Sequence, residues 1–270
     1  MPARPITFLS DYGLSDEFVG VAHGVIAGIC PEATVIDISH GVPRQDVQAG
    51  ALMLARSLPY MPAGVHLAVV DPEVGARRRA VALRTGSGDR LLVGPDNGLL
   101  IPAAERFDGV AEAVEISASS WRLEPVSATF HGRDVFAPVA ARLACGEPLA
   151  AAGTPLDPGE LVVLERTQPR QEADALVAHV VAIDSFGNVV LDAGFGDVME
   201  RGLKLGDAVA ARAEARRVRG VVARTFSDVA GGALLLYEDA GGALALAVNG
   251  GNAAALLGLR TGDEVRLESA

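Results

Sequence analysis

The spacing of apolar residues in the first half of the chain most constrains its fold. Short runs rich in β-branched residues, at 6–9, 34–38 and 66–70, alternate with two longer stretches at 16–29 and 46–58. The short runs are typical of buried strands, and the longer stretches have the apolar periodicity of helices. Strand–helix alternation favours a parallel sheet, because a helix returns the chain to the start of the next strand. The sequence therefore predicts an α/β domain with a mostly parallel sheet.

The predicted α/β domain covers residues 1–150 and ends where the pattern changes. Strands at 80–84 and 90–93 and a helix at 136–144 complete it. A linker is expected at 151–174, in a proline-rich stretch with little periodicity. Residues 175–270 are predicted to form a smaller, mainly-β, barrel-like domain, with strands at 177–183, 189–191, 208–212, 233–237 and 244–248.

The net charge and the hydropathy of the chain exclude several classes of binding partner. The 270 residues carry a formal net charge of −11, which disfavours binding to nucleic acid or to an anionic membrane. No segment reaches the roughly 18–20 apolar residues that span a bilayer, and the first apolar run is too short for a signal peptide. We expect a soluble cytoplasmic protein. Cys30 and Cys145 lack the number and spacing of a disulfide framework or a zinc site, so we expect small buried hydrophobic residues there.

Polar residues follow several of the predicted strands directly. Ser10 and Asp11 follow the first strand, His40 the second and Asp71 the third, and the sequence PDNG at 95–98 follows the fifth. Ligands of α/β sheets bind at the carboxyl ends of the strands. These positions are therefore the candidate site, although PDNG is also an ordinary turn sequence.

Two aspartates flank the turn after the first strand. Asp11 lies at the strand end, where a carboxylate can accept hydrogen bonds from the two hydroxyls of a ribose. Asp16 lies at the start of the next helix. The alternative for this pair is that Asp16 or Ser15 only caps that helix.

The loop VVDPEVGARRR at 69–79 is the second candidate element. Pro72 and Gly75 favour a turn that returns an arginine of the triplet 77–79 beside Asp71. The alternative is a solvated basic turn. In FHGRDVFAP at 130–138, His131 is either a site residue or a structural histidine.

The second domain offers polar and aromatic side chains in loops. Asp184 and Asn188 flank an aromatic residue in IDSFGN, and an Asn amide can read a purine edge through its paired donor and acceptor. Phe226 in TFSD is a possible stacking surface. The alternatives are that Asp184 and Asn188 are ordinary turn residues and that Phe226 belongs to the core. No segment has a phosphate-binding glycine motif.

Six segments in this order resemble the S-adenosyl-L-methionine hydroxide adenosyltransferases, hydrolytic relatives of the fluorinase. The segments span nearly the whole chain: ITFLSDYGLSDEFVG, VVDPEVGARRR, GPDNGLL, FHGRDVFAP, IDSFGN and AVNGGNAA. The resemblance implies cleavage of S-adenosyl-L-methionine by water to adenosine and methionine. It implies no metal and no cofactor, and assembly as a homotrimer with sites between subunits.

The resemblance also assigns roles to individual residues. It places a water-activating triad on Asp71, Arg78 and His131. For the substrate it implies Asp11 at the ribose hydroxyls, Asp16 and Asp184 near the methionine end, Asn188 and Phe226 near adenine, and backbone around Val248 and Asn249 completing the adenine site. Ala240 and Ala245 stand where relatives often carry Ser and Glu, so backbone contacts are expected to replace those side chains.

Three other functions compete with this interpretation. A halogenase would attack the same carbon with halide, but halogenases resembling this chain have a longer insertion than TGSGDR at 85–90 and lack the triad Asp and His. A non-catalytic adenosine-binding or S-adenosyl-L-methionine-binding protein would not need Asp71, Arg78 and His131 together. A metal hydrolase using Asp71, His131 and Asp96 lacks a recognisable full ligand set.

Overall fold

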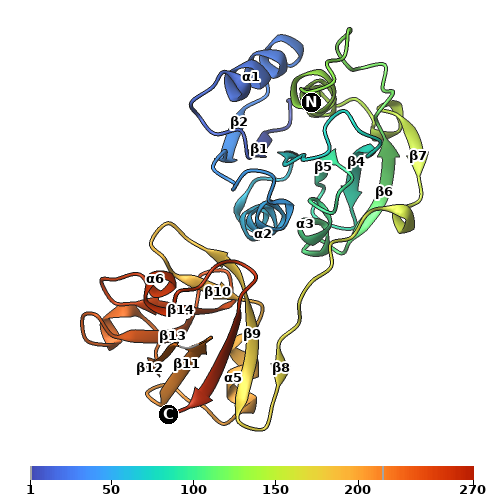
Figure 1. Ribbon diagram of the computed structural model, residues 1–270. Helices are drawn as coiled ribbons and strands as arrows, with labels where there is room; N and C mark the ends of the chain where they lie inside the picture. Colours follow the sequence, from blue (N-terminus) through green and yellow to red (C-terminus); the bar gives the residue numbers. More distant parts are fainter. Residues whose placement is uncertain (1, 215) are drawn as a thin grey trace. The chain divides into compact units, whose positions relative to one another are not determined.

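The computed structural model describes residues 2–214 and 216–270, and the chain divides into two compact units. The first unit is Met1–Leu164 and the second is Glu165–Ala270. Figure 1 traces the chain through them.

The first unit is built on a seven-stranded sheet with the order β2-β1-β3-β5-β4-β6-β7. Neighbours among the first four strands of this order run parallel, and the remaining pairs are antiparallel. The strand bounds are β1 Ile6–Ser10, β2 Val35–Ser39, β3 Val65–Val69, β4 Ala80–Thr85, β5 Leu91–Pro95, β6 Val110–Glu115 and β7 Thr154–Leu156. The predicted α/β class with a mostly parallel sheet is confirmed.

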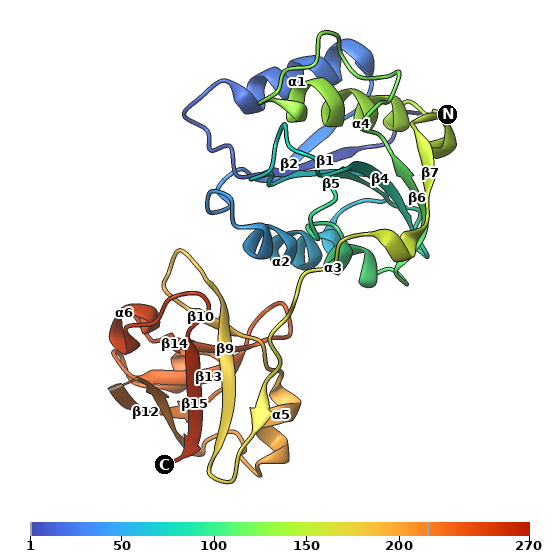
Figure 2. The same ribbon diagram turned by 45° about the vertical axis from the view of Figure 1, so that its right-hand side comes forward.

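Helices cover both faces of this sheet, as Figure 2 shows. The helices α1 (Phe18–Ile29) and α4 (Ala137–Ala144) share one face, and α2 (Val47–Ser57) and α3 (Ile101–Glu105) share the other. Every residue of β1 and of β3 is buried, because both faces of these strands are covered. This explains their near-continuous apolar sequences. The Asp46 carboxylate accepts a hydrogen bond from the Ala49 N–H and begins α2. A π-helical turn, Gly132–Phe136, leads into α4.

Short 3₁₀ turns and one β-strand fill the remaining segments of this unit. The 3₁₀ turns are Leu58–Tyr60, Leu149–Ala151 and Pro158–Glu160. The strand β7 lies inside the predicted linker 151–174 and pairs with β6. In the part of the chain that the structure describes, no helix has the length and apolarity needed to cross a bilayer.

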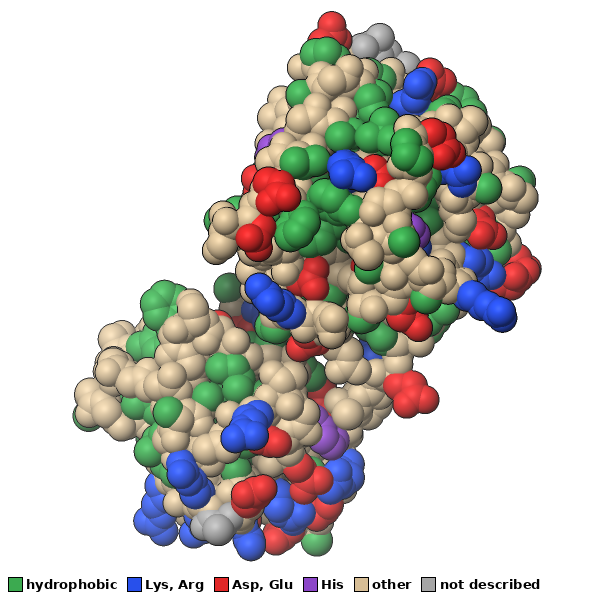
Figure 3. All heavy atoms as spheres, turned by 45° about the horizontal axis from the view of Figure 1, so that its top comes forward, with side chains coloured by type: hydrophobic (Ala, Val, Ile, Leu, Met, Phe, Trp, Pro, Cys, Tyr) green, Lys and Arg blue, Asp and Glu red, His purple; other side chains and the backbone are tan. Residues whose placement is uncertain are grey.

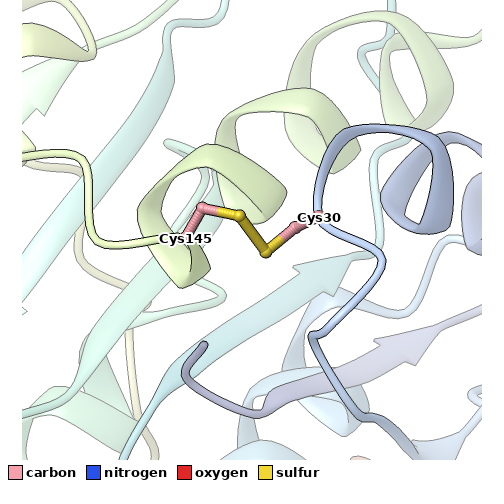
Figure 4. Close-up of a disulfide and its surroundings, with 2 residues drawn as sticks. All are labelled: Cys30 and Cys145. Atoms are coloured by element: carbon pink, nitrogen blue, oxygen red, sulfur yellow. A yellow bond between two sulfur atoms is a disulfide. The ribbon is translucent and has the colours of Figure 1, made fainter. Parts of the chain in front are cut away.

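The expectation for the two cysteines is wrong, because Cys30 and Cys145 form a disulfide (Figure 4). Cys30 follows the last residue of α1, and Cys145 follows the last residue of α4. The two helices lie side by side on one face of the sheet, so their carboxyl ends meet although the cysteines are 115 residues apart in sequence. Cysteine number and spacing contain no information about this packing.

The second unit is a closed β-barrel with two short helices. Its strands follow the order β10-β14-β13-β12-β11-β15-β9, and β10 also pairs with β9, which closes the ring. The strand β8 (Arg170–Gln171) adds to β9 outside the ring. The bounds are β9 Ala175–Ile183, β10 Val189–Leu191, β11 Ala208–Ala213, β12 Arg216–Val222, β13 Leu234–Glu238, β14 Leu244–Val248, β15 Glu264–Ser269, α5 Phe195–Glu200 and α6 Ala253–Leu257. The predicted barrel-like second domain is confirmed.

Alternating side chains of the barrel strands fill its interior or face outward. The inward set is aliphatic and includes Leu176, Val209 and Leu246. Outward arginines pair with carboxylates on other strands, as Arg217 of β12 does with Glu268 of β15 at 3.1 Å, across the intervening strand β11. Arginine and acidic side chains are accordingly interspersed on the face seen in Figure 3.

Candidate active site

A buried pair, Asp71 and Arg78, forms the centre of the candidate site in the first unit. Asp71 lies just beyond β3, and the loop of residues 71–78 returns to it as the turn signals predict. The Arg78 Nε donates to Asp71 Oδ1 at 2.9 Å, and the Arg78 Nη2 donates to Asp71 Oδ2. The two side chains are only 4% and 5% exposed. This two-bond geometry fixes the guanidinium and the carboxylate relative to each other.

His131 extends this pair to three residues. Its Nδ1 lies 3.0 Å from Arg78 Nη2. Because a guanidinium only donates hydrogen bonds, Nδ1 is the acceptor, and the neutral ring carries its proton on Nε2. Burial lowers the pKa of His131, and the positive charge of Arg78 lowers it further. The structure thus brings Asp71, Arg78 and His131 together.

The other arginines of the triplet have different surroundings. Arg77 is exposed. The Arg79 Nε donates to Asp96 Oδ2 at 2.8 Å, and Asp96 also accepts from the Val162 N–H. Arg78 is therefore the arginine of the triplet that is buried beside Asp71. Arg77 is exposed, and Arg79 binds Asp96, which in turn holds Val162.

Asp96 does not join Asp71 and His131 in a metal-ligand cluster within residues 2–214 and 216–270. Its carboxylate is occupied by Arg79 and the Val162 N–H. This geometry gives no support to the metal-hydrolase alternative.

Asp11 and Asp16 lie on the loop between β1 and α1. The Asp11 Oδ2 accepts a hydrogen bond from the Gln45 N–H at 2.9 Å. Asp16 is exposed. The helix α1 begins at Phe18 with Glu17 as its N-cap residue and no side-chain cap. The capping alternative for Asp16 and Ser15 is therefore wrong.

Tyr12 is a neighbour of the triad that the sequence analysis missed. A Cβ placed on Gly132 would lie 2.0 Å from the Tyr12 hydroxyl oxygen, so this hydroxyl contacts the backbone next to His131. Burial raises the pKa of Tyr12, and the charges of Asp11 and Asp71 raise it further, so the hydroxyl stays protonated. The glycine in the FHG sequence was the available signal, because it marks a close approach to backbone.

In the second unit, Asp184 holds the loop that carries Asn188. The Asp184 Oδ1 accepts from the N–H groups of Phe186 and Asn188, both at 2.9 Å, and its Oδ2 accepts from the Asn188 side-chain amide at 2.8 Å. Asn188 is 8% exposed, whereas the Phe186 ring at the loop tip is 77% exposed. The structure brings Asp184 and Asn188 together and presents an aromatic ring beside them.

The remaining residues expected near adenine lie in other parts of the barrel unit. Phe226 begins the 3₁₀ turn Phe226–Asp228, is 39% exposed and packs against Tyr237 with ring centroids 5.4 Å apart. Val248 ends β14, and its carbonyl accepts from the Gly251 N–H. The Asn249 carbonyl accepts from the Gly232 N–H. The carbonyls at these two positions each accept one hydrogen bond within the fold and retain a second lone pair.

Positions 240 and 245 differ in their environment. Ala240 is exposed in the turn between β13 and β14, and Ala245 is buried inside β14. A side chain at Ala240 would face solvent in this unit, whereas Ala245 belongs to the packed strand.

Two known protein-family domains match most of the chain. Residues 6–153 match the SAM hydroxide adenosyltransferase N-terminal domain, and residues 178–266 match the SAM hydroxide adenosyltransferase C-terminal domain.

Individual proteins are similar over two thirds of the chain or more. An (R)-S-adenosyl-L-methionine hydrolase from Salinispora tropica is 51% identical over 269 residues, 98% of each chain. A fluorinase from Nocardia brasiliensis is 34% identical over 211 residues, 69% of this chain and 70% of the relative. The crystal structure of an uncharacterized conserved protein from Thermotoga maritima aligns with a TM-score of 0.90 at 39% identity, covering 97% of this chain and 99% of that one.

Proposed function

The chain belongs to the SAM (S-adenosyl-L-methionine) hydroxide adenosyltransferase family, and we propose the following reaction and site for it. It is a SAM hydrolase. Water attacks the 5′-carbon of SAM, and the products are adenosine and L-methionine. The observation that carries this proposal is the hydrogen-bonded group of Asp71, Arg78 and His131, in which the Asp71 and Arg78 side chains are buried just beyond β3.

The chemistry of the substrate decides which help the enzyme must supply. A sulfonium leaves as a neutral thioether, so the reaction needs no general acid. The nucleophile limits the reaction, because water is a very weak acid and little hydroxide exists at neutral pH. The residues must therefore hold one water in line with the breaking carbon–sulfur bond and favour loss of its proton.

The hydrogen bonds of the triad divide these tasks. His131 uses Nδ1 to accept from Arg78, so its Nε2–H is a donor that can orient the water oxygen. Asp71 accepts one bond from Arg78 on each oxygen, and each oxygen retains lone pairs. In this arrangement Asp71 is the group that can accept the proton, and the Arg78 charge favours the developing hydroxide.

The other site residues are proposed to bind the substrate. Asp11 binds the ribose hydroxyls. Asp16 and Asp184 lie near the methionine end, where a carboxylate attracts the ammonium group. Asn188, Phe226 and the backbone at Val248 bind adenine, and residues 175–270 are in this sense an adenine-binding domain. Asp184 also fixes the conformation of the Asn188 side chain through its Oδ2.

The active species is proposed to be a homotrimer with sites between subunits and with no cofactor or catalytic metal. Residues of the first domain of one copy and the second domain of another would then act on the same substrate molecule. Heterologous contacts that close with a threefold rotation would place the second domain of each copy against the first domain of a neighbour.

Chromatography of SAM incubated with the purified protein tests the reaction class. Adenosine and methionine should form in equal amounts. The Arg78→Ala variant should lose on the order of 100-fold or more in rate, and Asp71→Asn and His131→Ala should lose similarly. The Arg77→Ala variant is the matched control, because Arg77 is the exposed neighbour in the same loop. Binding of SAM without turnover would instead support a non-catalytic binding protein.

A further inference from the structure

Two histidines and an aspartate form a compact cluster at the edge strand β2, apart from the triad. His23 comes from α1, Asp37 from β2, and His40 follows β2 directly. The Asp37 Oδ1 lies 2.9 Å from His23 Nε2 and 3.1 Å from His40 Nε2. One ligand atom from each of the three residues lies within 4.8 Å of the other two.

The buried member of this cluster has a nitrogen without a hydrogen-bond partner. The His40 side chain is 2% exposed, and its Nε2 has no hydrogen bond despite its closeness to Asp37. His40 Nε2 and Asp37 Oδ1 thus lie close together without the alignment of a hydrogen bond. Such an arrangement allows both atoms to point at a third atom, such as a bound cation, between them. An unpartnered buried nitrogen of this kind requires an explanation.

Ser10 holds the other ring nitrogen of His40. The His40 Nδ1 lies 2.8 Å from Ser10 Oγ, and Ser10 Oγ accepts a hydrogen bond from the Tyr12 N–H at 3.3 Å. With Nδ1–H donating to Ser10, the lone pair of the neutral imidazole is on Nε2, inside the cluster. Metal-binding histidines are held in this way by a partner on their other nitrogen.

We infer that His23 Nε2, Asp37 Oδ1 and His40 Nε2 bind a divalent transition-metal cation such as Zn²⁺, with solvent as the fourth ligand. Imidazole and carboxylate are suitable ligands for zinc. Zn–N bonds of about 2.0–2.1 Å in a tetrahedron separate the ligand atoms by roughly 3.3 Å. The observed 2.9 and 3.1 Å need only a small opening. The half-exposed His23 and Asp37 side chains, 35% and 42%, give a cation access from solvent.

The position of this site gives it a structural consequence. A bound cation would join α1 to the end of β2. The His40 carbonyl accepts from the Gly13 N–H at 2.7 Å, so β2 is already connected to the loop that carries Asp11 and Asp16. The inference does not rest on the proposed function, because none of the three ligands belongs to the proposed catalytic or substrate-binding residues.

Competition between the purified full chain and a chromophoric chelator for Zn²⁺ tests the site. We expect one ion per chain and a rise in unfolding temperature with added Zn²⁺. The His23→Gln and Asp37→Asn variants should each weaken binding by about 10-fold or more. Both positions are partly exposed, so the variants should fold, and circular dichroism checks this.

His179→Gln supplies the matched control. His179 forms a similar pair with Asp192, Nδ1 to Oδ2 at 2.9 Å, but this pair is not part of a three-ligand cluster among the described residues. This variant should bind Zn²⁺ as the unmodified chain does. Co²⁺ should give the visible absorption of a tetrahedral complex only where His23 and Asp37 are intact.

Two results would overturn the inference. Zn²⁺ affinity that is the same in His23→Gln, Asp37→Asn and the unmodified chain would place the ion elsewhere. Failure of millimolar Zn²⁺ to bind or to change the unfolding temperature would leave Asp37 as a hydrogen-bonding partner of the histidines only.

Discussion

Arg78 donates a hydrogen bond to Nδ1 of His131, and this bond exists only while the imidazole is neutral. Burial and Arg78 lower the pKa of His131 below the value of about 6.5 for a free imidazole. Protonation as the pH falls through this lowered pKa would place an N–H against the guanidinium. We therefore expect kcat/KM to fall on the acidic side with an apparent pKa below 6.5, and a plateau at neutral pH.

The His131→Asn variant separates this titration from other acidic groups. The Asn side-chain oxygen can still accept from Arg78 but does not titrate in this range. Its residual activity should lack the acidic limb that the unmodified enzyme shows. An acidic limb centred above pH 7, or one retained in His131→Asn, would contradict the assignment to His131.

Gly132 should be essential for the local geometry of the triad. An alanine Cβ at this position would meet the Tyr12 hydroxyl oxygen at 2.0 Å and Cζ at 3.0 Å, so one of the two segments must move. We expect Gly132→Ala to lower kcat by roughly 10-fold or more, because small displacements of catalytic groups are costly.

A second substitution identifies the contact that is responsible. Tyr12→Phe removes the colliding oxygen, so the Gly132→Ala/Tyr12→Phe enzyme should recover part of the activity. Gly28→Ala is the control, since a Cβ there meets open space in α1. If Gly132→Ala retains full activity, or the double variant is as inactive as the single one, the contact does not position the triad.

The sequence predicted the parallel core and the strand-end carboxylates well, because both follow from local periodicity. Buried on both faces, β1 and β3 have apolar sequences that reveal them, and Asp71 stands out where the apolar run stops. The strands β12 and β15 were missed, because charged outward residues such as Arg217 and Glu268 interrupt their apolar pattern. Contacts between distant segments were also missed. The approach of Tyr12 to Gly132 depends on tertiary packing and has no periodic signal.

The Cys30–Cys145 disulfide should contribute substantially to stability. It closes a loop with a sequence separation of 115 residues, and a loop of this size corresponds to on the order of 4–5 kcal/mol of denatured-state entropy, with measured effects often smaller. We expect Cys145→Ser to lower the urea midpoint of the first cooperative transition. Reduction of the unmodified protein should give the same shift, whereas Cys145→Ser should not respond to reductant. Equal midpoints for oxidised, reduced and substituted protein would show that the bond does not stabilise the fold.

Sites shared between subunits would allow two inactive variants to complement each other. Asp71→Asn removes a proposed catalytic group, and Asn188→Ala removes a proposed adenine contact. After joint dissociation and reassembly, mixed trimers should contain some sites with both residues intact, and activity should return. Light scattering establishes the oligomeric mass, and reassembly of each variant alone is the control. Mixed oligomers that remain inactive, or a fully active monomer, would disprove shared sites in a trimer.

The fate of the water oxygen shows whether water attacks the 5′-carbon of SAM. Turnover in water enriched in heavy oxygen, followed by mass spectrometry of both products, locates the new bond. We expect the label on the 5′-hydroxyl of adenosine, none in methionine, and no halogenated nucleoside when chloride or fluoride is added. Label in methionine, or halogenated nucleoside above background, would contradict it.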